Sequence, residues 1–307
     1  MPHTVQYRPV LIDELISTHR IASYGRVFST RTDAELVGAY LWNSHVCAAL
    51  YPLLNATEIT LRNAIDAALT ADLGKFWWKR GTLQYRSHTS GATTEPYPVS
   101  HLAGNFSSAY NAAQRERSRR MGRTFKGAPE HQEVVSKTEF STWEFILDSE
   151  YMGNNLIWPK HLGTVFKGIW PTTSAASMLK QCRERVSLVR NFRNRVFHHE
   201  PAWKRSGVTN EQQAVTHLHE KIHRITQLIA WVSPEKIDLL EKCGAIRSAY
   251  RACSLGEIER FKYQSKTITV NSMPKLIKVA QAASTRDVVM QVAIYGKRKM
   301  FYTVHPD

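Results

Sequence analysis

The chain is poor in the residues that would build a disulfide scaffold or a zinc ribbon. Its 307 residues include four cysteines, Cys47, Cys182, Cys243 and Cys253, and no two of them form a CxxC pair. This usage favours a reducing compartment. The sequence also lacks a run of about 18 apolar residues, which a membrane-spanning helix needs, and an apolar leader segment. We therefore expect a cytoplasmic protein with no membrane partner.

Acidic residues are few relative to basic ones. The chain has 26 Asp and Glu against 41 Lys and Arg, a formal net charge of +15 before its 13 His are counted. A field of this size attracts polyanions and repels basic partners. The remaining composition, with 43% hydrophobic and 22% charged residues, is that of an ordinary globular protein. Nucleic acid is therefore the leading class of partner.

Apolar residues recur at helical spacing along most of the first 234 residues. The predicted helices cover residues 9–28 (with a second start at Ser17 or Thr18), 33–73, 141–147, 175–200 and 210–232. Pro52 is expected to kink the second helix or split it, and Asn55 to Glu58 has the pattern of a capping box. Pro201 is expected to end the helix that starts at Ala175.

Two regions differ from this helical pattern. Residues 81–135 are rich in Ser, Thr, Gly and Pro, which predicts an exposed, loop-rich and basic insertion. After residue 234 the pattern favours strands at 267–270, 288–295 and 300–304, the last two joined by a hairpin turn at 296–299. The predicted fold class is mainly α: a helical domain over residues 1–234, followed by a small mixed α/β region over 235–307.

The residues best suited to chemistry lie near the end of the predicted helix 175–200. Arg190, Asn194 and His198 are spaced at i, i+4 and i+8, so they share one helix face. Arg193 lies roughly 140° from His198 around an ideal helix, and its long side chain or local unwinding must close that gap. Arginine pairs with phosphate, and histidine exchanges protons near neutral pH. Together they suffice for RNA cleavage without a metal ion or other cofactor.

In such a reaction the ribose 2′-OH attacks the adjacent phosphate, which leaves a 2′,3′-cyclic phosphate and a 5′-OH. His198 acts as general base or acid, and Arg193 neutralises charge on the phosphoryl oxygens. One His per chain supplies one of the two proton transfers, so a homodimer with a composite active site is expected. The alternative is a structural role, because such residues also satisfy the last carbonyls of a helix.

The hexapeptide from Arg193 to His198 resembles the RNxxxH signature of HEPN ribonucleases, in the form seen in Abi-like (abortive infection) bacterial proteins. Residues 53–64, LLNATEITLRNA, resemble the N-terminal LE…LRN helix of that family. STWEF at 141–145 and LIWP at 156–159 resemble its FGFW and LWP segments, although Thr142-Trp143 replaces the usual Gly-Phe. The resemblance covers roughly residues 10–230, and the last 70 or so residues have no counterpart.

The resemblance implies a HEPN-like helical bundle, a homodimer and a toxic ribonuclease of anti-phage defence. An antitoxin or a structured non-coding RNA is a further candidate partner. The implied catalytic residues are Arg193, His198 and Asn194. The supporting residues are Arg190, His199, Glu58, Arg62 and Asn63. We interpret the last three as a buried ion-pair and amide set that braces the motif helix, with a supporting part in catalysis as the alternative.

Basic residues in two segments are the expected RNA contacts. Residues 180–205 hold eight basic and two acidic residues, and residues 115–126 hold six and one. The predicted RNA-binding set is Arg195, Lys204, Arg205, Trp203, Arg115, Arg117, Arg119, Arg120, Arg123 and Lys126, with Trp203 as a base-stacking platform. A solvated helix face is the alternative for 115–126. A non-catalytic protein that binds structured RNA is the alternative function.

A second motif competes with the first. Residues 219–223, HEKIH, match HExxH, which on a helix presents two imidazoles to zinc with the Glu as base. This makes a zinc metallopeptidase a third, less favoured function. Lys221 would lie beside the metal, and the third ligand would have to be Glu235, Glu241 or a remote residue, with Glu235 beyond the predicted helix end. We therefore interpret His219 and His223, with His217, as a solvent-facing strip and predict no metal site.

Overall fold

The structure is a computed structural model that describes residues 8–79, 81–89, 91, 94–122, 127–262, 264, 267–286, 290–294 and 297–301. The chain divides into two compact units that interleave along the sequence. Unit 1 comprises residues 1–53, 192–223 and 239–307, and unit 2 comprises residues 54–191 and 224–238. The boundary predicted between residues 234 and 235 stays a prediction.

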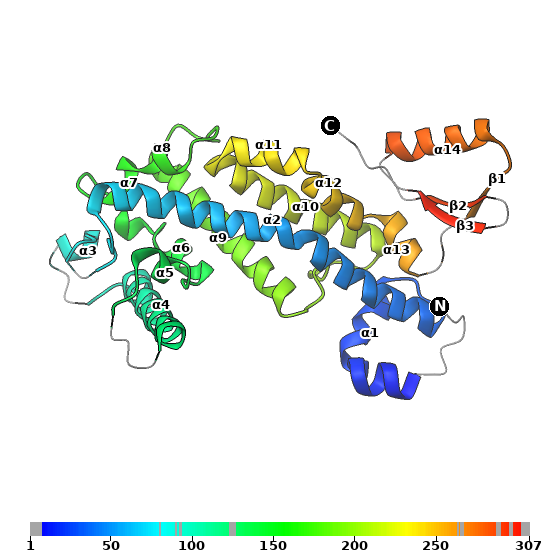
Figure 1. Cartoon of the computed structure of the whole chain (residues 1–307), viewed down its shortest axis with the longest axis horizontal. Coiled ribbons are helices and arrows are strands. Elements are labelled where there is room, and N and C mark those ends of the chain that lie inside the picture. Colours follow the sequence, from blue (N-terminus) through cyan, green and yellow to red (C-terminus); the bar gives the residue numbers. More distant parts are fainter. Residues whose placement is uncertain are drawn as a thin grey trace. The chain divides into compact units, whose positions relative to one another are not determined.

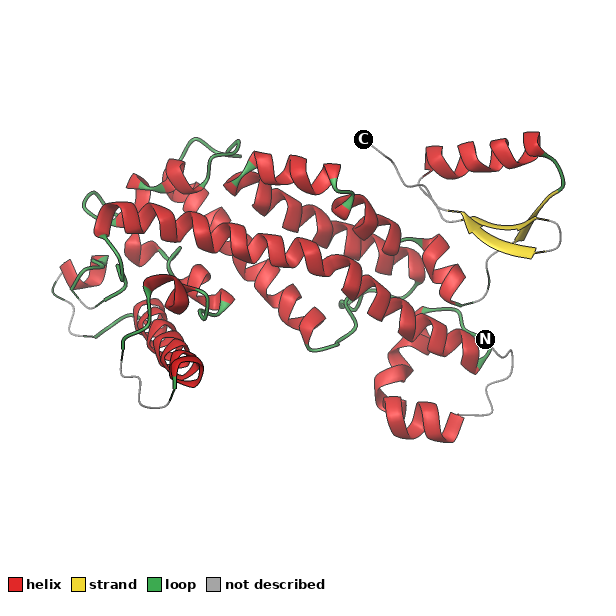
Figure 2. Cartoon of the chain, viewed as in Figure 1, coloured by secondary structure: helices red, strands yellow, loops and turns green. Residues whose placement is uncertain are grey.

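Helices account for most of the described chain, and the strands are confined to its C-terminal part (Figures 1 and 2). The elements are a π-helix Arg8–Ser17, α1 Thr18–Val27, α2 Asp33–Leu73, α3 Arg86–Thr89, α4 Tyr97–Met121, α5 His131–Val135, α6 Phe140–Phe145, a 3-10 helix Ser149–Tyr151, α7 Ile157–Lys160, α8 Leu162–Val165, α9 Ala175–Phe197, α10 Glu211–Val232, α11 Pro234–Lys242, α12 Ala245–Ala252, α13 Leu255–Phe261, β1 Thr267–Val270, α14 Met273–Arg286, β2 Met290–Ile294 and β3 Lys297–Phe301. The predicted mainly α fold with a small mixed α/β region near the C-terminus is confirmed. Among the helices of the described residues, none combines the length and the apolar character that a bilayer span requires.

The long helix α2 is continuous through Pro52, so the predicted new start and capping box at Asn55 are wrong. Proline removes one helical hydrogen bond, but apolar residues on both sides of it are anchored in the interior. Leu50, Leu53 and Leu54 are almost fully buried, while Pro52 itself is exposed. Burial of this apolar face outweighs the lost hydrogen bond.

The core of unit 1 contains an aromatic cluster. Trp203 packs edge-on against Tyr24 and Phe28, with ring centroids 5.2 and 5.0 Å apart, and Phe28 packs against Trp42 at 5.3 Å. The cluster joins α1 and α2 to the segment after α9. A second close contact lies at Gly38 of α2, where an added Cβ would lie 2.1 Å from the carbonyl oxygen of Phe261 in α13. Only glycine allows these two backbones to approach so closely.

In unit 2, the prediction that residues 81–135 form a loop-rich insertion is wrong. This segment includes the 25-residue helix α4, which buries one face at spacings of 3, 4, 3 and 4 residues. The buried residues are Val99, Leu102, Phe106, Ala109 and Ala113. The Ser and Gly residues between them hid this spacing, but they lie on the other faces of the helix, where they do not prevent burial of the apolar stripe.

A buried polar cluster supports the core of unit 2. The carboxylate of Asp66 accepts hydrogen bonds from the ring Nε1 of Trp77 and the ring Nε2 of His131, both at 2.9 Å. The backbone N–H of Phe76 donates to Nδ1 of His131 at 2.9 Å. His131 therefore links α5 to Asp66 of α2 and to the backbone of Phe76 through its two ring nitrogens.

The last described strands form a three-stranded sheet. β1 pairs with β2 in parallel, and β2 pairs with β3 in an antiparallel hairpin. The predicted strand at 267–270 and the predicted hairpin are confirmed, although β3 already begins at Lys297, inside the predicted turn. α14 connects the parallel strands, and Val279 packs with Val270 and Val292 in a small apolar core.

Candidate functional site

The RNxxxH motif lies at the C-terminal end of α9, within unit 1. Two backbone hydrogen bonds close this end: the N–H of Glu200 donates to the carbonyl of Arg195 at 3.0 Å, and that of His199 donates to Val196 at 3.2 Å. His199 adopts the left-handed conformation, with φ of 56°. This is the pattern of a Schellman cap. The helix therefore ends at Phe197 because of this cap. The prediction that Pro201 ends the helix is wrong.

His198 is exposed in the turn that follows α9. Its backbone N–H donates to the carbonyl of Asn194 at 2.9 Å. Within the described part of the chain, its ring makes no hydrogen bond or ion pair. A histidine in this position can exchange protons with a ligand that approaches from solvent.

Arg193 and Asn194 lie together beside this turn. The Nη1 of Arg193 donates to Oδ1 of Asn194 at 3.4 Å, and its guanidinium lies 4.3 Å from the ring centroid of Phe197. Both side chains are half-buried. The guanidinium is thus directed along α9 toward the helix end, which is the side on which His198 follows.

The backbone after the motif is held by side chains from three helices of unit 1. Arg20 of α1 donates to the carbonyl of His199, and Arg195 of α9 donates to the carbonyl of Lys204. Asn43 of α2 accepts from the N–H of Ala202 at 2.8 Å. Arg195 also lies 3.5 Å from Glu200. Arg195, predicted to bind RNA, therefore stabilises the turn on which the motif ends.

Four predicted supporting residues lie in unit 2. Arg190 forms an ion pair of 2.6 Å with Glu144 of α6, within the segment STWEF. On α2, Nε of Arg62 donates to Oδ1 of Asn63 at 3.3 Å. The prediction that Glu58, Arg62 and Asn63 form a buried set is wrong, because Asn63 is exposed and the other two are half-buried. The spacing of these residues on one helix predicts that they lie close together, but it does not predict how deeply they are buried.

Trp203 is not a base-stacking platform. Its side chain is 1% exposed and fills the aromatic cluster of unit 1. The neighbouring Lys204 and Arg205 are exposed, and Arg205 forms an ion pair of 3.2 Å with Glu220. Lys204 and Arg205 are therefore accessible, as expected for RNA contacts. Trp203 is not, because burial of its large apolar ring in the core is favourable.

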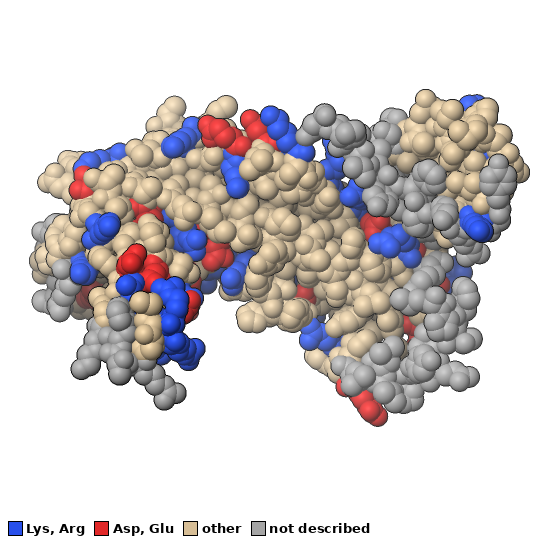
Figure 3. Space-filling model, in the orientation of Figure 1, with Lys and Arg blue, Asp and Glu red and all other residues tan. Residues whose placement is uncertain are grey.

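The basic stripe at the end of α4 is partly neutralised within unit 2. Arg117 and Arg120 each contact the carboxylate of Glu133 at 2.6 Å. A hydrogen bond from the backbone N–H of Glu130, together with these arginines, lowers the pKa of Glu133 to about 2. Figure 3 shows acidic and basic side chains next to one another over this region. Arg115 and Arg119 are exposed, whereas Arg123 and Lys126 lie outside the described residues.

The prediction of a solvent-facing strip formed by His217, His219 and His223 is wrong. The Nε2 of His219 hydrogen-bonds the carbonyl of Cys253 at 2.8 Å, and His217 is 7% exposed. Burial, with Lys221 and Arg205 nearby, lowers the pKa of His217 to about 4. Only His223 is exposed as predicted. In the described chain, no three His, Cys, Asp or Glu side chains are placed together so as to hold a metal ion.

Sequence reasoning missed a cavity of about 700 Å³ beside the end of α9 in unit 1. It is lined by Tyr40, Asn43, Ser44, Cys47, Ala48 and Tyr51 of α2, together with Val196, Phe197 and His199. The α2 residues recur at three- and four-residue spacing, which was the available signal. Burial raises the pKa of Cys47 to about 11, so its thiol stays protonated.

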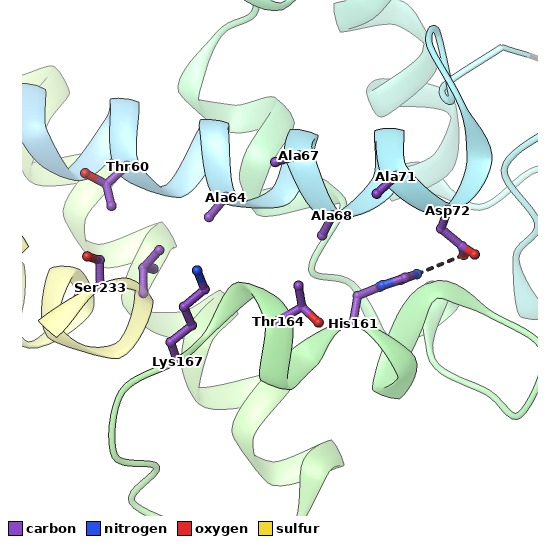
Figure 4. Close-up of a pocket in the computed structure, with 11 residues that line it drawn as sticks. Thr60, Ala64, Ala67, Ala68, Ala71, Asp72, His161, Thr164, Lys167 and Ser233 are labelled. Carbon is purple, nitrogen blue, oxygen red and sulfur yellow. Dashed lines mark hydrogen bonds and ion pairs between the residues drawn. The ribbon is translucent and has the colours of Figure 1, made fainter. Parts of the chain in front are cut away.

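A second cavity, of about 510 Å³, lies in unit 2 (Figure 4). Small side chains of α2, including Ala64 and Ala68, form one wall, and Lys167 extends toward them from the other side. At one end, Nε2 of His161 lies 2.9 Å from the carboxylate of Asp72. Hydrogen bonds from Lys160 and His161 lower the pKa of this carboxylate.

Comparisons with protein-family models, with curated proteins and with solved structures return no match for this chain.

Proposed function

We propose that the chain is a metal-independent endoribonuclease of the Abi-like HEPN type, which acts in the cytoplasm as an abortive-infection toxin against phage. The observation that carries the proposal is the end of α9. There, an exposed imidazole, His198, follows directly on a helix turn that holds Arg193 against Asn194 and Phe197. The net charge of +15 supports RNA as the substrate.

The chemistry follows from these groups. The guanidinium of Arg193 binds the scissile phosphate and neutralises the charge that grows on its oxygens as the 2′-OH attacks. Asn194 contacts this guanidinium and limits its freedom. His198 removes the proton from the 2′-OH or donates one to the departing 5′-oxygen. In a homodimer, His198 of each chain takes one of the two roles, which makes the active site composite.

The test is cleavage of total RNA by the purified protein in excess EDTA, with end-group analysis of the fragments. The proposal predicts cleavage in EDTA. The fragments should carry a 5′-OH that polynucleotide kinase labels without prior phosphatase treatment, and a cyclic phosphate that blocks 3′ ligation. Fragments with 5′-phosphates would contradict the proposed attack by the 2′-OH. One tightly held zinc per chain, with activity lost on chelation, would favour the peptidase motif instead.

A non-catalytic RNA-binding protein is the second candidate, and the exposure of Arg115 and Arg119 on α4 favours it. It predicts tight binding without fragments, with log affinity falling steeply as log salt rises. Replacing both arginines with alanine should reduce the magnitude of this slope by about 1.4 to 1.8, because each lost phosphate contact contributes about 0.7 to 0.9. Arg117 and Arg120, which both pair with Glu133, provide the matched control: replacing these two with alanine should change the slope less.

A further inference from the structure

The cavity beside α9 has an exposed aromatic rim. Tyr51 of α2 is 51% exposed and Phe197 of α9 is 39% exposed, and their ring centroids lie 5.5 Å apart. Most tryptophans of the described chain are buried, whereas these two aromatic rings are not. They offer flat apolar faces to a ligand that enters the cavity.

The same rim meets the guanidinium of the motif. Arg193 lies over the ring of Phe197, so a cation capable of binding phosphate adjoins an aromatic surface capable of stacking. Inside the cavity, the hydroxyl of Ser44 and the ring of His199 supply polar atoms. Among the described residues, neither side chain has a hydrogen-bond partner, so both can meet the polar edge of a ligand.

We propose that this cavity is a nucleobase-binding site, formed by Tyr51, Phe197 and the α2 face around Ala48, which receives a base of a single-stranded RNA whose phosphate contacts Arg193. The inference rests on the proposed function, because it places the base next to the phosphate that the motif would cleave. It adds a binding determinant outside the RNxxxH residues.

The geometry indicates how the base binds. A base held between two rings needs about 7 Å between them, twice the roughly 3.5 Å contact distance of stacked carbon atoms. The centroids of Tyr51 and Phe197 are closer, at 5.5 Å, and the rings are tilted by 34°. The base therefore stacks on the cavity side of the Tyr51 ring and does not insert between the pair. The cavity volume lies within the range of small-ligand sites.

The test is titration calorimetry of the full chain with AMP, GMP, CMP and UMP, and with ribose 5-phosphate as the ligand without a base. We expect the nucleotides to bind and ribose 5-phosphate to bind at least tenfold more weakly. Tyr51→Ala should weaken nucleotide binding by about 5- to 150-fold, the range for losing one stacked base, whereas Tyr51→Phe should retain it.

A filling variant tests the cavity itself. Ala48 is exposed on α2 and lines the cavity, so Ala48→Phe should occupy the space and abolish nucleotide binding without disturbing the core. Thr216→Phe, at an exposed position of α10 outside the cavity, is the matched control and should bind like the parent. Far-UV circular dichroism of each variant verifies that it is folded.

The outcomes separate this inference from the proposed function. Binding that is insensitive to Ala48→Phe and Tyr51→Ala, or equal for AMP and ribose 5-phosphate, would overturn the nucleobase site even if the protein cleaves RNA. Binding lost in both variants, in a protein that leaves RNA intact, would support the site and contradict the nuclease.

Discussion

Asn43 and Ala202 join α2 to the segment that follows the motif, through a buried hydrogen bond of 2.8 Å from the Ala202 N–H to the Asn43 side chain. Asn43→Ala leaves this N–H without its partner, and we expect the free energy of unfolding to fall by about 1–3 kcal/mol. Urea denaturation measures the change. Asn55→Ala, at an exposed position of the same helix, should change stability by less than about 0.5 kcal/mol. Equal effects of the two variants would show that the bond contributes nothing.

His198→Ala and Arg193→Ala should each reduce the rate of RNA cleavage by at least about a hundredfold, since each removes a group assigned to the transition state. Initial rates on one defined RNA, with urea denaturation to verify stability, measure the effect. His223→Ala, which removes another exposed imidazole of unit 1, is the matched control and should cleave at the parental rate. Parental rates in both motif variants would refute the assigned site.

His199 occupies a left-handed backbone position that favours glycine. His199→Gly should therefore keep the free energy of unfolding or raise it by up to about 1 kcal/mol. His199→Val should lower it by about 1–3 kcal/mol, because a β-branched residue is strained at positive φ. Thermal or urea denaturation of the pair checks the opposite signs. If the valine variant proved as stable as the glycine variant, the helix would not end in the cap described.

His217 should make stability depend on pH. Its pKa is about 4 in the folded chain, against an ordinary value near 6.5, because burial and nearby cations disfavour the charged ring. Between these values the unfolded chain binds a proton that the folded chain does not. Lowering the pH from 6.5 to 4 should therefore reduce the free energy of unfolding, by up to about 3 kcal/mol from this group.

Denaturant titrations at several pH values measure this slope. In His217→Gln the slope between pH 6.5 and 4 should become shallower, whatever the absolute stability of the variant. His19→Gln, at an exposed position of α1, should keep the parental slope. An unchanged slope in the His217 variant would mean that the ring titrates normally in the folded chain.

Periodic burial was predictable from the sequence, because an apolar stripe has a single physical interpretation. The stripe of α9 from Leu179 to Val196 and that of α10 from Val215 to Ile229 are buried as their spacing predicts. Loop-like composition was a weaker guide, as α4 shows. Composition averages over all faces of a helix, whereas the fold depends on the one face that is buried.

The geometry of the candidate site was predictable only in part. The positions of Arg193, Asn194 and His198 near a helix end follow from local sequence, and so does the exposure of Lys204 and Arg205. The burial of Trp203 and the ion pair of Arg117 with Glu133 depend on segments distant in sequence or on the course of the chain between helices. Local patterns carry no information on such contacts, and the cavity near Tyr51 was missed for the same reason.

A substitution at Gly38 can test the role of the C-terminal region without deleting that region. Because a single methyl group at this position would collide with the main chain of α13, Gly38→Ala is a minimal wedge that displaces that helix while all 307 residues remain present. The contribution of the region after α13 to the proposed dimerisation and RNA binding can thus be tested in a protein of unchanged charge and nearly unchanged mass.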